Sequence, residues 1–387
     1  MQRLVRSPWA DVATAAGFSF LVVCSIGALL LVGLKLQAPS LGAGASAPSI
    51  LAGIVIVGLA CLGTPTQIGD VSVSLLPLGG LLAIAVATSW SAAGLVRKID
   101  APRLGQRVAW GAALGVPLGL ICGAAALVFR IRDSAEPVLS QPTWALGLGL
   151  FWGALFGGLG ALASMGSLAS LGPLLAQLRT RAPMFHDGLK VAITVLAVAL
   201  VTAGVASLAW VVLFLAGGAV GEFGAADALA GIIHFALFAP NAFIWTTTIS
   251  LGAPLELAAG LAGAARSGGI DHVLSLWSWP GGTPWYAYTL LAIPAAAGLA
   301  GGVALARSEV ERPIAALGVG AVGVAITIFI LASISGARVA PGLLRPRAFA
   351  YVAPDSKIAA ALSAAWVMGG GATALMLESR RRRVPVE

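Results

Sequence analysis

Several stretches of this chain run for more than twenty residues without a charged side chain. Residues 12–34 hold 23 such positions, residues 108–129 hold 22 and residues 313–337 hold 25. An α-helix rises about 1.5 Å per residue, so about 20 apolar residues cross a hydrocarbon core of roughly 30 Å. Uncharged runs of this length predict membrane-spanning helices.

The overall composition excludes a water-soluble globular domain. Hydrophobic residues make up 59% of the 387 positions and charged residues 10%, whereas soluble domains carry about 25% charged residues. The short segments of alternating polarity that build a transmembrane β-barrel do not recur along the chain. We therefore expect an all-α fold, a polytopic bundle of transmembrane helices.

The net charge of +8 does not predict a nucleic-acid-binding protein. The arginines cluster at the ends of the apolar runs, where the positive-inside rule places them. No RNA-reading aromatic motif and no zinc-finger spacing is present. Cys24, Cys61 and Cys122 lie singly within apolar runs, which predicts small buried residues. Membrane lipids are the expected surroundings, and nucleic acid is not an expected partner.

Ten segments have the hydropathy of a membrane-spanning helix. They lie near residues 11–34, 49–63, 75–96, 107–129, 143–169, 190–216, 228–250, 284–306, 313–335 and 357–377. The second has only about 15 residues, fewer than the ~20 that a crossing helix needs. The seventh contains Pro240, and proline removes a helical hydrogen bond and clashes with the preceding turn. We predict that both are broken or re-entrant elements that return to their side of entry, which leaves eight full spans.

The distribution of basic residues supports this count. With eight spans, 15 arginines and lysines fall on the side of the two termini and 8 on the other side; if all ten segments cross, the split is 10 to 13. The positive-inside rule favours the eight-span arrangement and places both termini in the cytoplasm. One alternative stays open, because residues 143–178 are long enough for two spans, which would give a split of 11 to 12.

The two halves of the chain, residues 1–178 and 179–387, have the same predicted layout. Each has one span, then a short dipping element, then three further spans. The tetrapeptide "LAGI" opens both dips, at Leu51–Ile54 and at Leu229–Ile232. This layout predicts a parallel internal duplication, and in duplicated transporters the functional site lies between the repeats.

The stretch "GTPTQIGDVSVSLLPLGG", from Gly63 to Gly80, follows the first dip. Its Val-Ser-Val-Ser alternation at residues 71–74 has the two-residue period of a β-strand. Non-helical backbone persists at membrane depth only where protein buries it or water surrounds it. We predict an extended segment at the outer mouth of the bundle; the alternative is a hydrated loop.

Charged side chains are absent from the predicted spans, so the candidate site consists of neutral or weakly ionisable groups. It comprises Thr64, Gln67, Asp70, His234, Pro240, Asn241 and Thr246. These groups are predicted to line a hydrated cavity for a neutral solute or a lipid headgroup, with His234 able to titrate near neutral pH or to hold a ligand. The alternatives are hydrogen bonds between helices for the histidine and for the uncharged polar side chains, Gln67 and Asn241 included, and a turn role for Asp70.

Enzymatic motifs are missing. No HExxH pair, no pair of acids within spans, no G-x-S-x-G elbow and no Walker A sequence is present. We therefore expect neither catalysis nor a cofactor or metal. The basic run Arg380, Arg381, Arg382 and Arg383 follows the last span and is predicted to fix that end of the chain in the cytoplasm or to bind anionic lipid.

Two pieces of the sequence resemble a known family. At "TPTQIGDVSVSLLPLGGLLAIA" and "LFAPNAFIWTTTISLGAP" the chain is similar to the streptophobe family of actinobacterial multi-pass membrane proteins, and more distantly to PerM-like cell-division and envelope membrane proteins. Both families carry "TPLG" after an alternating stretch; residues 76–79 here read "LPLG", with leucine in place of threonine. Both also carry a late "PN" followed by tryptophan, matched by Pro240, Asn241 and Trp245.

The resemblance implies a multi-pass protein of the bacterial cytoplasmic membrane. The streptophobe family has no settled activity, whereas the PerM-like group implies support of the envelope or of division through other membrane proteins. Our leading hypothesis from the sequence is therefore a non-enzymatic integral membrane protein that supports the envelope through protein or lipid contacts. The second hypothesis, based on the paired dips and their polar residues, is a permease for a neutral or lipid-like solute.

Overall fold

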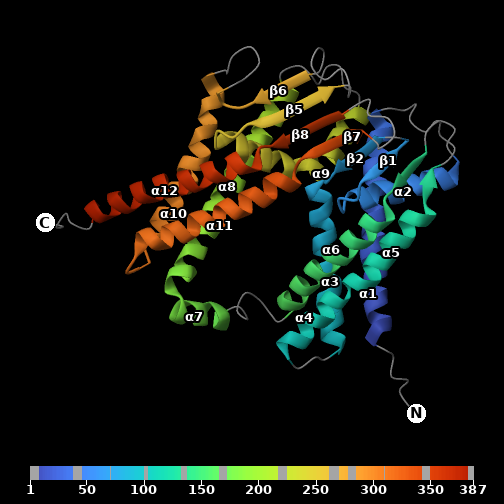
Figure 1. The fold of residues 1–387 in the computed structure, drawn as a ribbon, viewed down its shortest axis with the longest axis horizontal. Helices are drawn as coiled ribbons and strands as arrows, with labels where there is room; N and C mark the ends of the chain where they lie inside the picture. Colours follow the sequence, from blue (N-terminus) through green and yellow to red (C-terminus); the bar gives the residue numbers. More distant parts are fainter. Residues whose placement is uncertain are drawn as a thin grey trace. The chain divides into compact units, whose positions relative to one another are not determined.

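The computed structural model describes most of the chain (Figure 1). The described residues are 8–37, 46–69, 71–99, 103–131, 137–164, 172–216, 225–260, 270–277, 285–308, 310–341 and 349–381. Within them, nine helices are long and apolar enough to cross a membrane. The prediction of an all-α, multi-pass membrane protein is confirmed.

The nine candidates include all eight predicted spans. They are α1 (Pro8–Gln37), α3 (Leu78–Ile99), α4 and α5 in succession (Leu104–Ala113 and Gly115–Val128), α6 (Pro142–Ala163), α8 (Pro183–Ala216), α9 (Ala225–Ser250), α10 (Ala292–Ala306) preceded by the 3₁₀ helix η3 (Trp285–Leu291), α11 (Pro313–Ile334) and α12 (Ser356–Arg381). Two further helices are shorter, α2 (Ala47–Ala60) and α7 (Gly172–Arg181). Residues 143–163 thus belong to a single helix; residues 165–171 lie outside the described residues, so the choice between one span and two for residues 143–178 stays a prediction.

The chain divides into two compact units. Unit 1 contains Met1–Ser170, Glu222–Phe238 and Ala337–Phe349, and unit 2 contains Leu171–Gly221, Ala239–Gly336 and Ala350–Glu387. Helix α9 therefore contributes its first half to unit 1 and its second half to unit 2. The division into residues 1–178 and 179–387 stays a prediction about the repeat, because the compact units take segments from both halves.

Each unit carries a small antiparallel sheet beside its helices. In unit 1 the strand order is β3 (Arg130–Ile131), β4 (Val138–Ser140), β1 (Thr66–Ile68), β2 (Val71–Leu75) and β7 (Ala337–Pro341). In unit 2 it is β8 (Phe349–Pro354), β5 (Leu255–Gly260) and β6 (Ile270–Leu274). The predicted extended segment is strand β2. All five of its residues are partly buried, so it does not divide into one buried and one exposed face.

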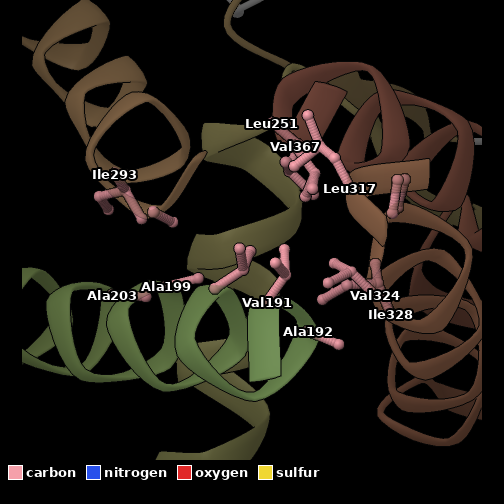
Figure 2. Close-up of a cluster of buried hydrophobic side chains, with 14 of the residues drawn as sticks. Val191, Ala192, Ala199, Ala203, Leu251, Ile293, Leu317, Val324, Ile328 and Val367 are labelled. Atoms are coloured by element: carbon pink, nitrogen blue, oxygen red, sulfur yellow. The ribbon is translucent and has the colours of Figure 1, made fainter. Parts of the chain in front are cut away.

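The core of unit 2 is built from side chains of four helices and of the turn after α9. Figure 2 shows Val191 and Ala199 on α8 facing residues of α10, α11 and α12. Its buried members include Val191, Val195, Ala203, Leu251, Ala253, Ile293, Ala297, Leu305, Ala316, Leu317, Ala321, Val324, Ile328, Ala359 and Val367. The small alanines let the helix backbones approach closely, which is how packing is achieved where lipid is as apolar as the core.

Helix α2 enters unit 1 only part of the way along the bundle. Ser46 caps its start by accepting a hydrogen bond from the Ser49 backbone N–H at 3.4 Å. Gly27 of α1 lies against the Ile54 carbonyl and Gly58 lies against the Val23 carbonyl, so α2 is antiparallel to α1 and ends beside its middle.

The chain then returns to the end from which α6 starts. The Trp152 indole N–H donates to the Leu62 carbonyl at 3.0 Å, and Trp152 lies ten residues, or about 15 Å, into α6. Three residues after Leu62, the Pro65 carbonyl accepts from the backbone N–H of Gln141, just before α6 begins (3.2 Å). Residues 49–63 thus form a short helix and a turn that lead the chain back toward the start of α6; that this element is re-entrant in a membrane stays a prediction.

Helix α9 corrects the prediction for residues 228–250. It is one uninterrupted helix with Pro240 inside it, so the predicted break is wrong. Proline has no N–H to offer the Ala236 carbonyl four residues earlier, and that carbonyl faces Gly79 of α3, where a Cβ atom would lie 2.4 Å away. Neighbouring groups commonly accommodate a proline inside a membrane helix in this way.

Within unit 2, the second half of α9 also reaches only halfway along the bundle. The Asn241 amide and the Trp245 indole N–H both donate to the Ser335 carbonyl at 3.2 Å, and Ser335 caps the end of α11. The Leu251 carbonyl accepts from the indole N–H of Trp366 at 3.3 Å, ten residues into α12. By length and composition α9 is a ninth candidate span, and a re-entrant course for residues 228–250 stays a prediction.

The two helices that are predicted to be re-entrant end in the same turn. "LGTP" (Leu62–Pro65) follows α2 and "LGAP" (Leu251–Pro254) follows α9. Gly63 and Gly252 have φ values of +88° and +93°, a conformation that glycine adopts without steric cost. The N–H of each glycine donates to the carbonyl three residues earlier at 2.8 Å. Gly63 lies near Leu148 and Gly252 near Leu362, at the same 3.8 Å to a built Cβ atom.

The residues of α6 that contact the first turn and the residues of α12 that contact the second turn are separated by one constant offset of 214 positions. It joins Gln141 to Asp355, Leu148 to Leu362 and Trp152 to Trp366, and the backbone N–H of Asp355 donates to the Pro254 carbonyl at 2.9 Å as Gln141 does to Pro65. The pentapeptide "AALGV" recurs at residues 112–116 and 315–319, and its leucines, Leu114 and Leu317, are both fully buried. The units are therefore two copies of one five-helix design.

The predicted match of the two "LAGI" tetrapeptides is only part of this relation. They are 229 − 51 = 178 residues apart, whereas the glycines of the turns are 252 − 63 = 189 residues apart. The difference of 11 residues is about three helical turns. Helix α9, with 26 residues, is longer than α2, with 14, by about the same length.

Candidate functional site

The candidate site is built around the two turns that end the re-entrant helices. Turn 1 is defined as Leu62–Thr66 in unit 1, and turn 2 as Leu251–Leu255 in unit 2. At each turn the backbone leaves the helix and continues as a strand, so its N–H and C=O groups need partners that α-helical backbone would supply itself. The tryptophan N–H groups on α6 and α12 supply one such partner each.

Two buried hydroxyls of turn 1 and one of the neighbouring strand β4 have unmet hydrogen-bonding capacity. Thr64 and Ser140 are fully buried and Thr66 is 9% exposed. None of the three hydroxyl oxygens has a hydrogen-bond partner among the described residues. Thr66 and Ser140 are direct cross-strand partners, so their side chains leave the sheet on the same face. Buried polar atoms are nearly always hydrogen-bonded, so three neighbouring orphans indicate a place for water or a ligand.

Two more buried polar atoms of unit 1 lack a partner in the described part of the chain. They are the Thr88 hydroxyl on α3 and Nε2 of His234 on the first half of α9. His234 lies beside Gly33 of α1, where a Cβ atom would be 3.2 Å from Nε2. Among the described residues, Nε2 of His234 therefore makes no hydrogen bond to a neighbouring helix, which was the alternative.

Turn 2 differs, because it contains no hydroxyl and the hydroxyls just before it, at the end of α9, are satisfied within that helix. Thr247 donates to the Phe243 carbonyl at 2.8 Å, and Ser250 donates to the Thr247 carbonyl at 2.7 Å. Both, with Ser363 of α12, border a cavity of about 20 Å³, which is room for about one water molecule.

Asn241 and Thr246 link helices and do not border that cavity. Asn241 is 2% exposed and donates to the end of α11. The Thr246 and Ser207 hydroxyls are hydrogen-bonded at 2.8 Å, which joins α9 to α8. For these two residues the structure shows the cross-linking role that the sequence left as an alternative.

The remaining predicted residues lie apart from the turns or outside the described chain. Gln67 is in β1, opposite Ser72 and Leu139. Arg380 and Arg381 are exposed in the last turn of α12, with Arg381 at 4.0 Å from Glu378. Asp70, Arg382 and Arg383 lie outside the described residues.

No protein-family model, curated protein or solved structure matches the chain. The resemblance to the streptophobe and PerM-like families therefore stays a prediction, and the interpretation of the site rests on its geometry.

The geometry offers no metal site within the described residues, since no group of three His, Cys, Asp or Glu side chains comes together there. The buried polar side chains of that part of the chain are Ser, Thr, Asn and His. Such a set donates and accepts hydrogen bonds without fixed charge.

Ser140 is the residue that sequence reasoning missed. It lies 140 − 66 = 74 positions from Thr66, and only the pairing of β4 with β1 brings the two together. The sequence gives no direct signal for it, since Ser140 ends the short stretch "VLS" and Gln141 is the residue that immediately precedes α6.

Proposed function

We propose that this multi-pass membrane protein is a permease for a small uncharged polar solute, with turn 1 as the solute site. The observation that supports it is the trio of buried, unpartnered hydroxyls at the end of a re-entrant helix. Transporters commonly place substrate sites where half-helices end and backbone becomes extended. Hydroxyls without a nearby charge suit a solute that both donates and accepts hydrogen bonds.

Charge selectivity follows from the same residues. A buried ion needs an opposite charge or many oriented dipoles to offset its desolvation. The buried set of the described chain contains no carboxylate, lysine or arginine. An uncharged solute such as a polyol or an amide meets no such penalty, and it exchanges its hydrogen bonds with water for bonds to Thr64, Thr66 and Ser140.

The test is solute flux into proteoliposomes containing the full chain. We expect uptake of at least one of glycerol, urea and erythritol above that of empty vesicles. The double variant Thr64→Val, Ser140→Ala should lower that flux about tenfold, since it removes two hydrogen bonds of about 0.5–1.5 kcal/mol each. The control is Thr14→Val on α1, an exposed threonine bonded to its own helix at 2.8 Å.

Thermal stability distinguishes this role from a structural one. Replacing an unsatisfied buried hydroxyl by an apolar group of the same shape leaves the stability of the fold nearly unchanged or raises it. Thr64→Val should therefore leave the melting temperature unchanged or raise it while flux falls. A fall in stability with no effect on flux, or the absence of flux for every solute, contradicts the proposal.

One observation favours a second candidate, non-catalytic support of the envelope through protein or lipid contacts. The cavity that Leu251 of turn 2 borders holds only about 20 Å³, and Leu59, Cys61 and Leu62 at turn 1 are fully buried. Such tight packing suits a rigid scaffold for other membrane proteins. The flux experiment separates the two, because a scaffold passes no solute.

We further propose that both termini lie in the cytoplasm of a bacterial cell. In unit 1 the β1–β2 hairpin precedes α3, and Arg103 follows it at the opposite end of that helix. In a cysteine-free background, Ser72→Cys should react with an impermeant maleimide in intact cells and Arg103→Cys should not. Labelling of position 103 with protection of position 72 would invert this orientation.

A further inference from the structure

Helix α3 of unit 1 carries an apolar stripe that faces away from the core. Leu82, Val86 and Trp90 lie four residues apart and are 59%, 57% and 78% exposed. With Phe18 of α1 they border an open groove of about 640 Å³. Spacing of four residues places these side chains on one face of the helix, so the groove runs along the helix axis.

The groove leads into a basic pocket at the end of α3. Trp90 borders both the groove and a second hollow of about 360 Å³, which Ser89, Arg97 and Ser164 also line. Arg97 and Ser164 in turn border a third hollow of about 210 Å³ together with Arg107 of α4. Among the described residues, Arg97 forms no ion pair. The three hollows therefore form one path from an apolar wall to a pair of guanidinium groups.

The dimensions of this path match one leaflet of a bilayer. From Leu82 to Trp90 the helix rises about 12 Å and from Trp90 to Arg97 about 10 Å. Half of a hydrocarbon core is about 15 Å thick. From the start of α3 at Leu78 to Trp90 the helix rises about 18 Å, less than the roughly 30 Å of a full core, so Trp90 lies at acyl-chain depth with the rest of the apolar stripe and Arg97 lies near phosphate depth.

We propose that this path binds one anionic phospholipid. An acyl chain lies along Leu82, Val86 and Trp90, and the phosphate accepts hydrogen bonds from Arg97 and Arg107. Guanidinium groups present paired N–H donors that fit phosphate oxygens. Basic pockets between transmembrane helices recognise anionic headgroups through this combination of charge and shape.

The corresponding place in unit 2 has the opposite charge, which makes the site specific to unit 1. There the ends of α10 and α12 and the start of α11 border a hollow of about 610 Å³, lined in part by Glu311 and Glu378. Carboxylates repel an anionic headgroup. Arg307 caps the end of α10, and Arg97 lies in the last turn of α3. Because the two arginines have similar positions, Arg307 is a matched control for the loss of a charge at a helix end.

The test uses tryptophan quenching in vesicles. The full chain is reconstituted in phosphatidylcholine with a small fraction of brominated lipid, either phosphatidylglycerol or phosphatidylcholine. Bromine quenches only tryptophans that it contacts, and the part due to Trp90 is the difference from the Trp90→Phe variant. We expect brominated phosphatidylglycerol to quench this part more than brominated phosphatidylcholine at equal content.

Arg97→Gln should reduce the preference for phosphatidylglycerol about fivefold, the effect of one basic residue near a membrane surface. Arg97→Lys keeps the charge and should keep most of the preference, so the pair remains informative if one variant is poorly folded. Arg307→Gln should leave the preference unchanged. Equal quenching by the two lipids, or equal losses in Arg97→Gln and Arg307→Gln, would overturn the proposal.

Discussion

Gly27→Val is expected to displace helix α2 from unit 1 and to lower the free energy of unfolding by about 3 kcal/mol, the upper end of the usual cost of overpacking. A Cβ atom at position 27 would lie 2.1 Å from the Ile54 carbonyl and 2.6 Å from the Gly58 backbone nitrogen. Both are backbone atoms, which cannot rotate away as the end of a side chain can. Helix α2 must therefore move as a body, and turn 1 moves with it.

Cys61 reports this movement directly. It is fully buried at the end of α2, so a membrane-permeant maleimide should not label it when Cys24 and Cys122 are replaced by alanine. In Gly27→Val we expect labelling of Cys61 and a lower melting temperature in detergent.

The matched control is Gly17→Val, ten residues earlier on the same helix, where an added Cβ meets nothing within 4 Å. Equal effects of the two valines would mean that helix propensity, and not the contact between α1 and α2, causes the loss.

The sequence predicted the spans well because their signal is local. Runs of about 20 uncharged residues specify a helix in lipid without reference to any other part of the chain. The prediction was wrong at Pro240 because the rule that proline breaks helices assumes that the freed carbonyl has nothing to contact. In the structure Gly79 of α3 faces the Ala236 carbonyl, and a residue 157 positions away in the chain gives no signal at position 236 (236 − 79 = 157).

The candidate site was predicted only in part for the same reason. Thr64 was found because it lies in a polar stretch between two apolar runs, whereas Ser140 reaches turn 1 only through the pairing of β4 with β1. The duplication was inferred from "LAGI", although the structurally equivalent motif is the L-G-x-P turn. Short words recur by chance in a chain rich in Leu, Ala and Gly. The positive φ values of Gly63 and Gly252 identify the equivalent positions. A φ value is a property of the folded backbone, and the residue letters do not show it.

Trp152→Phe and Trp366→Phe are expected to destabilise their units by the same mechanism. Each removes the indole N–H that donates to the carbonyl at the start of a re-entrant turn, Leu62 in one unit and Leu251 in the other. A buried carbonyl left without its donor costs about 1–3 kcal/mol. The bond from Trp152 is 3.0 Å long and that from Trp366 is 3.3 Å, so Trp152→Phe should be the more costly of the two.

The double variant tests whether the two indole hydrogen bonds contribute independently to the free energy of unfolding. Because the two tryptophans share no partner, their separate costs should add to within about 0.5 kcal/mol, giving a combined loss of about 2–6 kcal/mol. Thermal or denaturant unfolding of the four proteins in one detergent measures this. Trp144→Phe, an exposed position on α6, controls for the loss of indole area. If both single variants are as stable as this control, the indole bonds do not hold the turns, and the re-entrant helices are held by packing at glycines such as Gly27 and Gly58 alone.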